Sequence, residues 1–280
     1  MGYFDFEKKS DYVVCIDSDG CAMDTMEVKH RECFGPQWIK TYGLDAHFDE
    51  CMELWLSINL YTITRGINRF KGLALALEEV ERRGLAHTEG LEEFSAWTKD
   101  AKELSNPALM ALTQKSENPC FELALLWSIR TNRAIHGLPG DDAPFENVKR
   151  AMDEMCRQSD LVAVSSANSE AVEAEWTKHH LKEDCRVLLT QEAGSKAFCI
   201  GELLSGPGYE TAKTLMVGDA PGDKDAAAKN GVWFYPILAG KEGESWARLL
   251  DEAFPKLLAG TFDEEYQKQL ISEFEKNLGV

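Results

Sequence analysis

Two acidic clusters contain the residues of this chain that are best suited to chemistry. Asp17 and Asp19 flank Ser18, and in an extended chain two such side chains leave the backbone on the same side. Like charges this close raise one another's pKa unless a cation intervenes, so the pair suits either metal binding or a division of nucleophilic and acid–base roles. The second cluster holds Asp219 and Asp223. Taken alone, each cluster could also be a solvated turn or a helix cap.

The types of residue in these clusters indicate which metal to expect. Oxygen ligands drawn from two places in the chain are what Mg²⁺ prefers. The eight cysteines stand singly, without a Cys-x-x-Cys pair, so a zinc site is disfavoured. We expect the thiols to be reduced and to serve mostly as small apolar residues.

Two further polar positions could contact an anion. Ser165 and Ser166 directly follow an apolar run, and a hydroxyl there could donate to a phosphoryl oxygen or cap a helix. Lys196 stands in the small-residue sequence Ala-Gly-Ser-Lys-Ala, a turn that opens the next helix. An isolated lysine is most often a solvated surface residue.

The elements that must position these residues are predicted from five short apolar runs, at 12–16, 161–164, 186–189, 214–217 and 232–235. Runs of this kind are typical of strands covered on both faces. Helical stretches separate them, which indicates a doubly wound parallel sheet of the α/β class. Ligands bind at the carboxyl ends of such strands, and Asp17, Ser165 and Asp219 each follow one.

A different pattern extends from about residue 25 to 140. Apolar residues recur there at helical spacing, as in 69–83 and 121–135, which predicts a helical insertion. Asn106 and Asn118 each precede proline and are expected to cap helices. The tail after residue 245 is also expected to be helical and to pack on the sheet domain.

These boundaries define two domains. We predict a Rossmann-like core from residues 1–24 and 144–280, and an all-helical inserted domain from residues 25–143. We expect Trp38, Trp55 and Trp127 to form the core of the insertion, since large aromatic residues usually pack between helices.

The order of the four polar groups resembles the haloacid dehalogenase (HAD) superfamily. The segment Asp17 to Thr25 (Asp-Ser-Asp-Gly-Cys-Ala-Met-Asp-Thr) is similar to its first motif, and Gly218, Asp219 and Asp223 are similar to its fourth. The resemblance covers roughly residues 10–24 and 144–240, and the insertion resembles a C1-type cap. Cys21 replaces a common Thr, Ser18 an apolar residue, and Lys196 lacks the usual following Pro.

The resemblance implies a Mg²⁺-dependent phosphatase that hydrolyses a small-molecule phosphomonoester. Asp17 would be the nucleophile that becomes an aspartyl phosphate, and Asp19 would serve first as general acid and then as general base. The Asp17 carboxylate, the Asp19 backbone carbonyl and Asp219 would hold Mg²⁺, with Asp223 a ligand through water or an orienting group.

The resemblance also implies which residues contact the substrate. Ser165 and Lys196 would bind the phosphoryl oxygens, with Ser166 beside them. Substrate choice would depend on the cap, where the segment 62–72 concentrates cations. There we expect Arg65 above all, with Asn68 and Arg69, to recognise an anion, although the same residues could simply begin a solvated helix.

The overall charge limits the partners. A formal net charge of -18 and a pI near 4.8 disfavour unspecific attraction to nucleic acid or to anionic lipid. No apolar run approaches the roughly 20 residues that span a bilayer. We therefore expect a cytoplasmic protein whose partner is a small phosphorylated metabolite, and the sequence gives no indication of its oligomeric state.

Three alternatives share these motifs. A phosphomutase acting on a sugar phosphate would form the same aspartyl phosphate but exclude water. A catalytically silent binding protein could retain the fold, although it would have no physical need for unpaired carboxylates side by side. A receiver-like signalling domain is disfavoured by the long helical insertion.

Overall fold

The computed structural model describes residues 4–140 and 142–280. The chain divides into two compact units, one of Met1–Thr25 with Asp141–Val280 and one of Met26–Gly140. The predicted division after residue 24 and before residue 144 lies within a few residues of these bounds. Each unit is described by itself.

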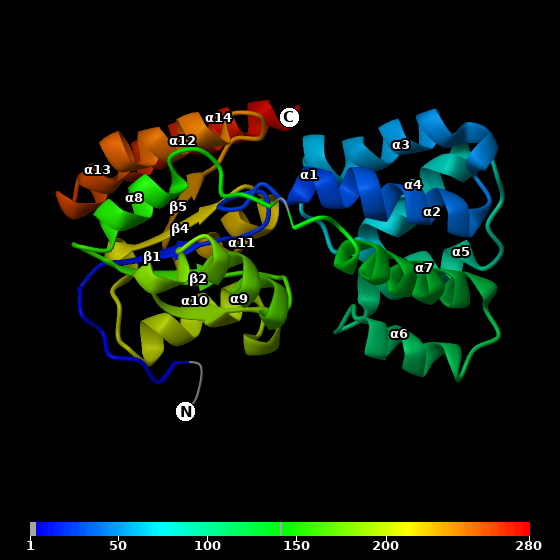
Figure 1. Ribbon diagram of the computed structural model, residues 1–280, viewed down its shortest axis with the longest axis horizontal. Helices are drawn as coiled ribbons and strands as arrows, with labels where there is room; N and C mark the ends of the chain where they lie inside the picture. Colours follow the sequence, from blue (N-terminus) through cyan, green and yellow to red (C-terminus); the bar gives the residue numbers. More distant parts are fainter. Residues whose placement is uncertain (1–3, 141) are drawn as a thin grey trace. The chain divides into compact units, whose positions relative to one another are not determined.

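The first unit is built on a five-stranded parallel sheet (Figure 1). Its strands are β1 (Val13–Ile16), β2 (Asp160–Val164), β3 (Cys185–Leu189), β4 (Thr214–Gly218) and β5 (Trp233–Pro236). The order is β3-β2-β1-β4-β5, so β1 is central and pairs with β2 and β4. The predicted α/β class with a parallel sheet is confirmed. Each apolar run forms a strand within two residues of its expected position.

Helices cover both faces of this sheet, because alternate strand residues point to opposite sides. Val14 and Ile16 face α8, α9, α12 and α13, whereas Val13 and Cys15 face α10 and α11, and α14 contributes to both cores. The tail after residue 245 is helical, as predicted. The helices are α8 (Val148–Met155), α9 (Ser169–Lys178), α10 (Lys196–Ser205), α11 (Pro221–Asn230), α12 (Glu242–Arg248), α13 (Phe254–Leu258) and α14 (Glu264–Asn277), with a π-helical segment at Leu249–Ala253.

A fully buried carboxylate anchors the amino-terminal end of β2. The Asp160 side chain accepts hydrogen bonds from the backbone N–H groups of Lys9 and Ser10 at 2.8 and 3.0 Å, from Tyr209 Oη at 2.7 Å, and from Arg186 Nε. Burial alone would raise the pKa of Asp160, but these donors lower it below its ordinary value. The network links the segment before β1, which contains Lys9 and Ser10, to Arg186 on β3 and to Tyr209.

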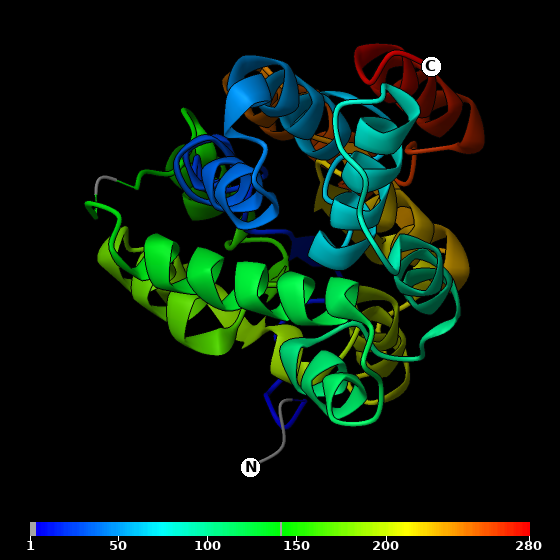
Figure 2. The same ribbon diagram turned by 90° about the vertical axis from the view of Figure 1, so that its right-hand side faces the viewer.

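The second unit is helical, and α6 and α7 pack beside one another in it (Figure 2). Its core holds Trp38, Trp55 and Trp127, all 0% exposed, as predicted. Its helices are α1 (Met26–Val28), α2 (Gly35–Tyr42), α3 (Phe48–Leu56), α4 (Arg69–Arg82), α5 (Leu91–Asp100), α6 (Asn106–Thr113) and α7 (Pro119–His136), with π-helical segments at Lys29–Phe34 and Ser57–Tyr61.

The two expected asparagine caps have different outcomes. Asn118 caps α7, because its Oδ1 accepts from the Cys120 N–H at 2.8 Å. At α6 the prediction was wrong by one residue: Ser105 is the cap, and its Oγ accepts from the Ala108 N–H at 3.2 Å. Asn106 is instead the first helical residue.

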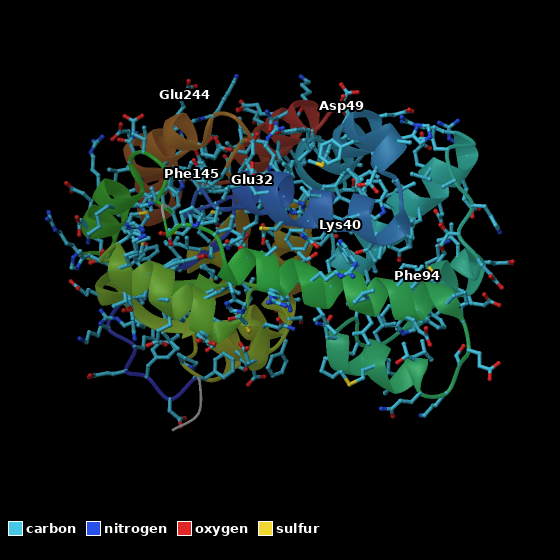
Figure 3. All side chains as sticks on the ribbon, turned by 45° about the vertical axis from the view of Figure 1, so that its right-hand side comes forward. Glu32, Lys40, Asp49, Phe94, Phe145 and Glu244 are labelled. Atoms are coloured by element: carbon cyan, nitrogen blue, oxygen red, sulfur yellow. The ribbon has the colours of Figure 1, made fainter. Side chains whose placement is uncertain are left out.

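The surface of the helical unit carries charged side chains over an aromatic core. Glu32, Lys40 and Asp49 are exposed, whereas Phe94 is buried (Figure 3). Across residues 4–140 and 142–280, every helix falls short of the length and apolar character needed to cross a membrane.

Candidate active site

Asp17 stands at the tip of the central strand. Its backbone N–H donates to the Val217 carbonyl at 3.0 Å, which continues the ladder between β1 and β4. The chain then turns sharply: the Ser18 carbonyl accepts from the N–H groups of Ala22 and Met23, both at 2.9 Å. Gly20 permits this turn with φ at 78°. The turn leaves Asp17 only 6% exposed.

Two tryptophan side chains donate hydrogen bonds to the same turn. Trp176 on α9 donates its indole N–H to Ser18 Oγ at 2.8 Å, and Trp246 on α12 donates its indole N–H to the Cys21 carbonyl at 2.8 Å. Because Trp176 supplies a donor, a buried hydroxyl at position 18 is satisfied where an apolar residue is more usual. The Ser18 hydroxyl therefore has a hydrogen-bond partner inside the protein.

The second acidic cluster forms where β4 passes into α11. Asp223 lies in the first turn of the helix, and its Oδ2 accepts from the Ala220 N–H at 3.1 Å. Gly218 makes room for this carboxylate, since a Cβ at position 218 would lie 2.3 Å from Asp223 Oδ2. Only glycine at position 218 leaves Asp223 in this place.

The structure brings the two clusters together. Carboxylate oxygens of Asp17, Asp219 and Asp223 all lie within 4.8 Å of one another, and all three residues are buried. Lys196, the first residue of α10, places its Nζ 2.8 Å from Asp17 Oδ1 and 2.5 Å from Asp223 Oδ1. Four residues from three distant parts of the sequence therefore form one charged group at the carboxyl edge of the sheet.

The electrostatics of this group favour a bound cation. Burial raises the pKa of Asp17 well above its ordinary value, and Lys196 opposes this effect while Asp223 and Asp219 add to it. Burial alone would lower the pKa of Lys196, but Asp17 and Asp223 raise it. Three carboxylates facing one ammonium group leave excess negative charge in a buried place, and such a set of oxygen donors suits a divalent cation such as Mg²⁺.

Cys21 lies close to this group, yet its thiol does not suit a ligand. Burial, followed by the charges of Asp17, Asp219 and Asp223, raises its thiol pKa well above the ordinary value. The thiolate is the form that binds metals. The neutral thiol of Cys21 instead faces the Val217 carbonyl at 3.6 Å.

Asp19 is held apart from the three carboxylates. It is partly exposed, its Oδ1 accepts a hydrogen bond from Thr25 Oγ1, and it is not a member of the carboxylate group found among the described residues. The sequence did not indicate this contact of Thr25, although Thr25 closes the segment that resembles the first motif. The predicted metal contact through the Asp19 backbone carbonyl stays a prediction.

The serines lie at the tip of the neighbouring strand β2. Ser165 is 3% exposed, its N–H donates to the Leu189 carbonyl at 2.8 Å, and its Oγ accepts from the Ala167 N–H at 3.1 Å. In this contact the Ser165 hydroxyl is the acceptor, so its proton is not used by it. Ser166 is exposed. Asn168 is the residue that caps α9, accepting from the Ala171 N–H at 3.0 Å.

The predicted anion-binding residues of the insertion lie in the helical unit, where each makes contacts of its own. Arg65 is 5% exposed, and its Nη1 donates to the Leu60 carbonyl at 2.8 Å. Asn68 caps α4, with Oδ1 accepting from the Phe70 N–H at 2.9 Å. Arg69 contacts neutral side chains of α7. Their roles toward a substrate stay predictions.

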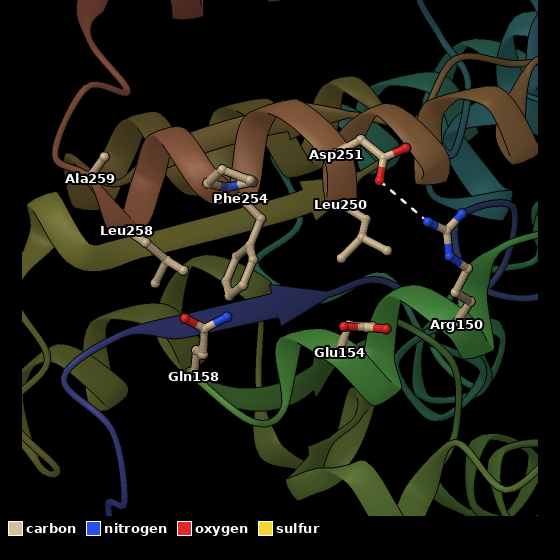
Figure 4. Close-up of a pocket in the computed structure, with 9 residues that line it drawn as sticks. Arg150, Glu154, Gln158, Leu250, Asp251, Phe254, Leu258 and Ala259 are labelled. Atoms are coloured by element: carbon tan, nitrogen blue, oxygen red, sulfur yellow. Dashed lines mark hydrogen bonds and ion pairs between the residues drawn. The ribbon is translucent and has the colours of Figure 1, made fainter.

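A groove of about 610 Å³ lies elsewhere in the sheet unit, between α8 and the C-terminal helices (Figure 4). An ion pair joins Arg150 to Asp251 at 3.4 Å across it. It is lined by Arg150, Glu154, Gln158, Leu250, Asp251, Phe254, Pro255, Leu258 and Ala259. None of these residues belongs to the acidic group, so the groove is separate from the candidate active site.

A parallel sheet with acidic strand tips and a helical unit inserted after β1 defines a Rossmann-like α/β protein with a helical insertion. No family model matches the sequence, and no curated protein matches it. Among solved structures, a haloacid dehalogenase-like family hydrolase from Xanthomonas campestris is 12% identical, with 91% of this chain and 97% of that protein covered and a TM-score of 0.51.

A candidate phosphoglycolate phosphatase from Lactobacillus delbrueckii subsp. bulgaricus is 14% identical, with 96% of this chain and 99% of that protein covered and a TM-score of 0.51. The chain therefore has the fold of the HAD-like hydrolases. The resemblance seen in the motifs is confirmed at the level of the fold, including the helical insertion.

Proposed function

We propose that this chain is a Mg²⁺-dependent phosphatase that hydrolyses a small-molecule phosphomonoester through an aspartyl phosphate. The observation that carries the proposal is the buried group of Asp17, Asp219 and Asp223, with Lys196 in contact with Asp17 and Asp223. A fold shared with HAD-like hydrolases is consistent with this chemistry. A buried carboxylate group is costly unless it binds something, which favours a site over a structural cluster.

In the first step Asp17 is the nucleophile. One of its carboxylate oxygens attacks phosphorus, a new O–P bond forms, and the bond from phosphorus to the leaving oxygen breaks. Asp19, protonated at this stage, gives its proton to the leaving oxygen, so an alcohol departs. Thr25 holds the Asp19 side chain through a hydrogen bond to Oδ1, which fixes the direction of proton transfer.

In the second step the Asp19 carboxylate acts as a base. It takes a proton from water, the water oxygen attacks the phosphorus of the aspartyl phosphate, and the bond between phosphorus and the Asp17 oxygen breaks. Inorganic phosphate leaves, Asp17 is regenerated as a carboxylate, and Asp19 is again protonated for the next turnover.

The remaining residues bind and neutralise charge. Asp17, Asp219 and Asp223 would hold Mg²⁺, which would supply positive charge against the anionic phosphoryl group. Lys196 keeps its ammonium group against Asp17 Oδ1, where it orients the nucleophile and attracts phosphoryl oxygens. The Ser165 hydroxyl donates to one of those oxygens, with Ser166 beside it.

We also propose the class of substrate and the compartment in which the reaction takes place. The substrate is a small phosphorylated metabolite in the cytoplasm, since an acidic chain does not attract nucleic acid or anionic lipid. Arg65 and Asn68 contribute to recognising the part of the substrate beyond the phosphoryl group.

A phosphate-release screen tests this function. Purified protein with Mg²⁺ is expected to release inorganic phosphate from at least one member of a panel of sugar, nucleotide and small-acid monophosphates. Asp17→Asn should abolish release while leaving the fold intact. Asp225→Asn, on the exposed side of the same helix as Asp223, is the matched control and should retain activity.

Two outcomes would count against the proposal. Interconversion of sugar phosphates without phosphate release would indicate a mutase. Unchanged phosphate release by Asp17→Asn would exclude Asp17 as the nucleophile.

A further inference from the structure

Arg69 occupies an unusual environment at the start of α4. Its Nη1 donates to Ser128 Oγ at 3.0 Å and to Asn132 Oδ1 at 2.6 Å, both on α7. Its guanidinium carbon lies 5.0 Å from the centre of the Phe34 ring. Every one of these partners is electrically neutral, so the positive charge is not compensated by them.

The neighbouring side chains extend this neutral environment. The Ser128 hydroxyl donates a hydrogen bond to Oδ1 of Asn106, the first residue of α6, at 2.7 Å. Ser128 and Asn132 are one helical turn apart and so lie on the same face of α7. Side chains of α7 and of the π-helical segment that contains Phe34 thus contact the guanidinium group of Arg69, and α6 is linked to it through Ser128.

The lack of an acidic partner is notable in a chain with 48 acidic and 30 basic residues. Within residues 4–140 and 142–280, no carboxylate lies within ion-pair distance of Arg69. Arg186 is partly buried, as Arg69 is, but pairs with Asp160, and the exposed Arg82 pairs with Glu79 at 2.6 Å.

Burial without a counter-charge is unfavourable for a cation. It lowers the pKa of Arg69 to about 10, and burial is the cause of that shift. At neutral pH the guanidinium is still charged, so an anion that reached it would gain a strong, charge-assisted interaction.

Arg69 has N–H donors that its hydrogen bonds to Ser128 and Asn132 do not use. Both hydrogen bonds of Arg69 to described residues come from Nη1, so the edge formed by Nε and Nη2 is unused by them. Two parallel N–H groups on one edge match the two oxygens of a carboxylate or of a phosphate group. Contact with Phe34, Ser128 and Asn132 fixes the plane of the guanidinium in advance, which reduces the entropy lost on binding.

We propose that Arg69, oriented by Ser128, Asn132 and Phe34, is the binding site for a small oxyanion, a carboxylate or a phosphate group, within the helical unit. The proposal does not depend on the chemistry of Asp17. It gives a specific environment and ligand class to Arg69, which the sequence had named for anion recognition after Arg65.

A local reporter makes the site testable in the full chain. The Trp127 indole N–H donates to the Phe34 carbonyl at 3.2 Å, and the Phe34 ring lies beneath Arg69. The Trp127 indole signal in ¹H–¹⁵N spectra, assigned with Trp127→Phe, is followed during titration with inorganic phosphate, with malonate, and with sodium chloride at matched ionic strength.

In the unmodified protein we expect a saturable shift of the Trp127 signal with phosphate, with malonate or with both, and none with chloride. A larger response to phosphate or to malonate identifies the favoured anion. In Arg69→Gln the binding should be at least about tenfold weaker, because one charge-assisted, two-pronged contact is lost. Arg69→Lys should bind with intermediate strength, since it keeps the charge and loses the fork.

Arg82→Gln is the matched control, because Arg82 ends the same helix, is exposed and is paired with Glu79. It should bind the anion as the unmodified protein does. Phosphate that still binds to Arg69→Gln without moving the Trp127 signal belongs to the proposed catalytic site, so the two proposals can fail separately.

A purely structural role for Arg69 predicts a different pattern. The anions would then produce no saturable Trp127 shift, or the same shift in the unmodified protein and in Arg69→Gln. Arg69→Gln would also lower the thermal midpoint equally with and without phosphate. Any of these results overturns the proposal.

Discussion

Replacing Lys196 by methionine removes the only ammonium group in contact with Asp17 and Asp223 among the described residues. The substitution keeps most of the side-chain volume and leaves the carboxylates without their partner. Removing one member of a buried ion pair costs about 3–5 kcal/mol. We therefore expect the free energy of unfolding to fall by about 3–5 kcal/mol when no divalent cation is present.

The response to Mg²⁺ distinguishes a metal site from a structural ion pair. Without Lys196 the three carboxylates lose their neutralising charge, so a divalent cation binds them more strongly. Ligand binding to the folded state raises stability by mass action. We expect Mg²⁺ to raise the free energy of unfolding in the unmodified protein, and to raise it more in Lys196→Met.

Urea unfolding with EDTA or with saturating Mg²⁺ measures both effects. Lys224→Met is the matched control, because Lys224 follows Asp223 and pairs with Glu275 at 2.9 Å near the surface, where a pair contributes about 0–1 kcal/mol. The reasoning is refuted if Lys196→Met loses no more stability than the control, or if Mg²⁺ stabilises neither the variant nor the unmodified protein.

Three further substitutions give separate tests. Gly218→Ala places a Cβ 2.3 Å from Asp223 Oδ2, so we expect calorimetric titration to show Mg²⁺ affinity at least about tenfold weaker. Trp176→Phe leaves the buried Ser18 hydroxyl without its donor, and a double-mutant cycle with Ser18→Ala should give a coupling free energy of about 1 kcal/mol by urea unfolding. Asp160 has a lowered pKa, so its contribution to stability is present above the unfolded value of about 3.9 and is lost on acidification through its folded pKa. In Asp160→Asn, unfolding at a series of pH values should show a loss of about 3–5 kcal/mol at neutral pH and a weaker dependence on acid.

The strands and their functional tips were predictable from local sequence. A run such as Val13–Ile16 is apolar at every position because both faces of the strand are buried. Polar residues that directly follow such a run must lie at the carboxyl edge of the sheet. Asp17, Ser165 and Asp219 could therefore be placed at one edge before any coordinates were known.

The contacts that tune the site could not be predicted in the same way. Trp176 is separated from Ser18 by 158 positions, and nothing in the residues around it indicates that its indole N–H is directed at that hydroxyl. The contacts of Lys196 with both Asp17 and Asp223 depend on how α10 and α11 pack, which no single segment encodes. Long-range side-chain geometry is set by packing, not by local propensity.

The helical unit gives a similar lesson for Arg65 and Arg69. Both lie in the same cationic segment, and the sequence favoured Arg65 for its forked donors. Only the structure shows that Arg65 is buried and that its guanidinium donates a hydrogen bond to the Leu60 carbonyl. The neutral surroundings of Arg69 come from α7, which is distant in sequence, so local charge could not rank the two residues.

The central claim is that Asp17, Asp219 and Asp223 hold one Mg²⁺ beside a phosphoryl group on Asp17. A crystal structure of the protein grown with Mg²⁺ and trifluoroberyllate, a mimic of a phosphoryl group, tests it most directly. We expect beryllium bonded to an Asp17 carboxylate oxygen and one Mg²⁺ in contact with the carboxylates. Beryllium absent from Asp17, with Mg²⁺ absent from the three carboxylates, would contradict it.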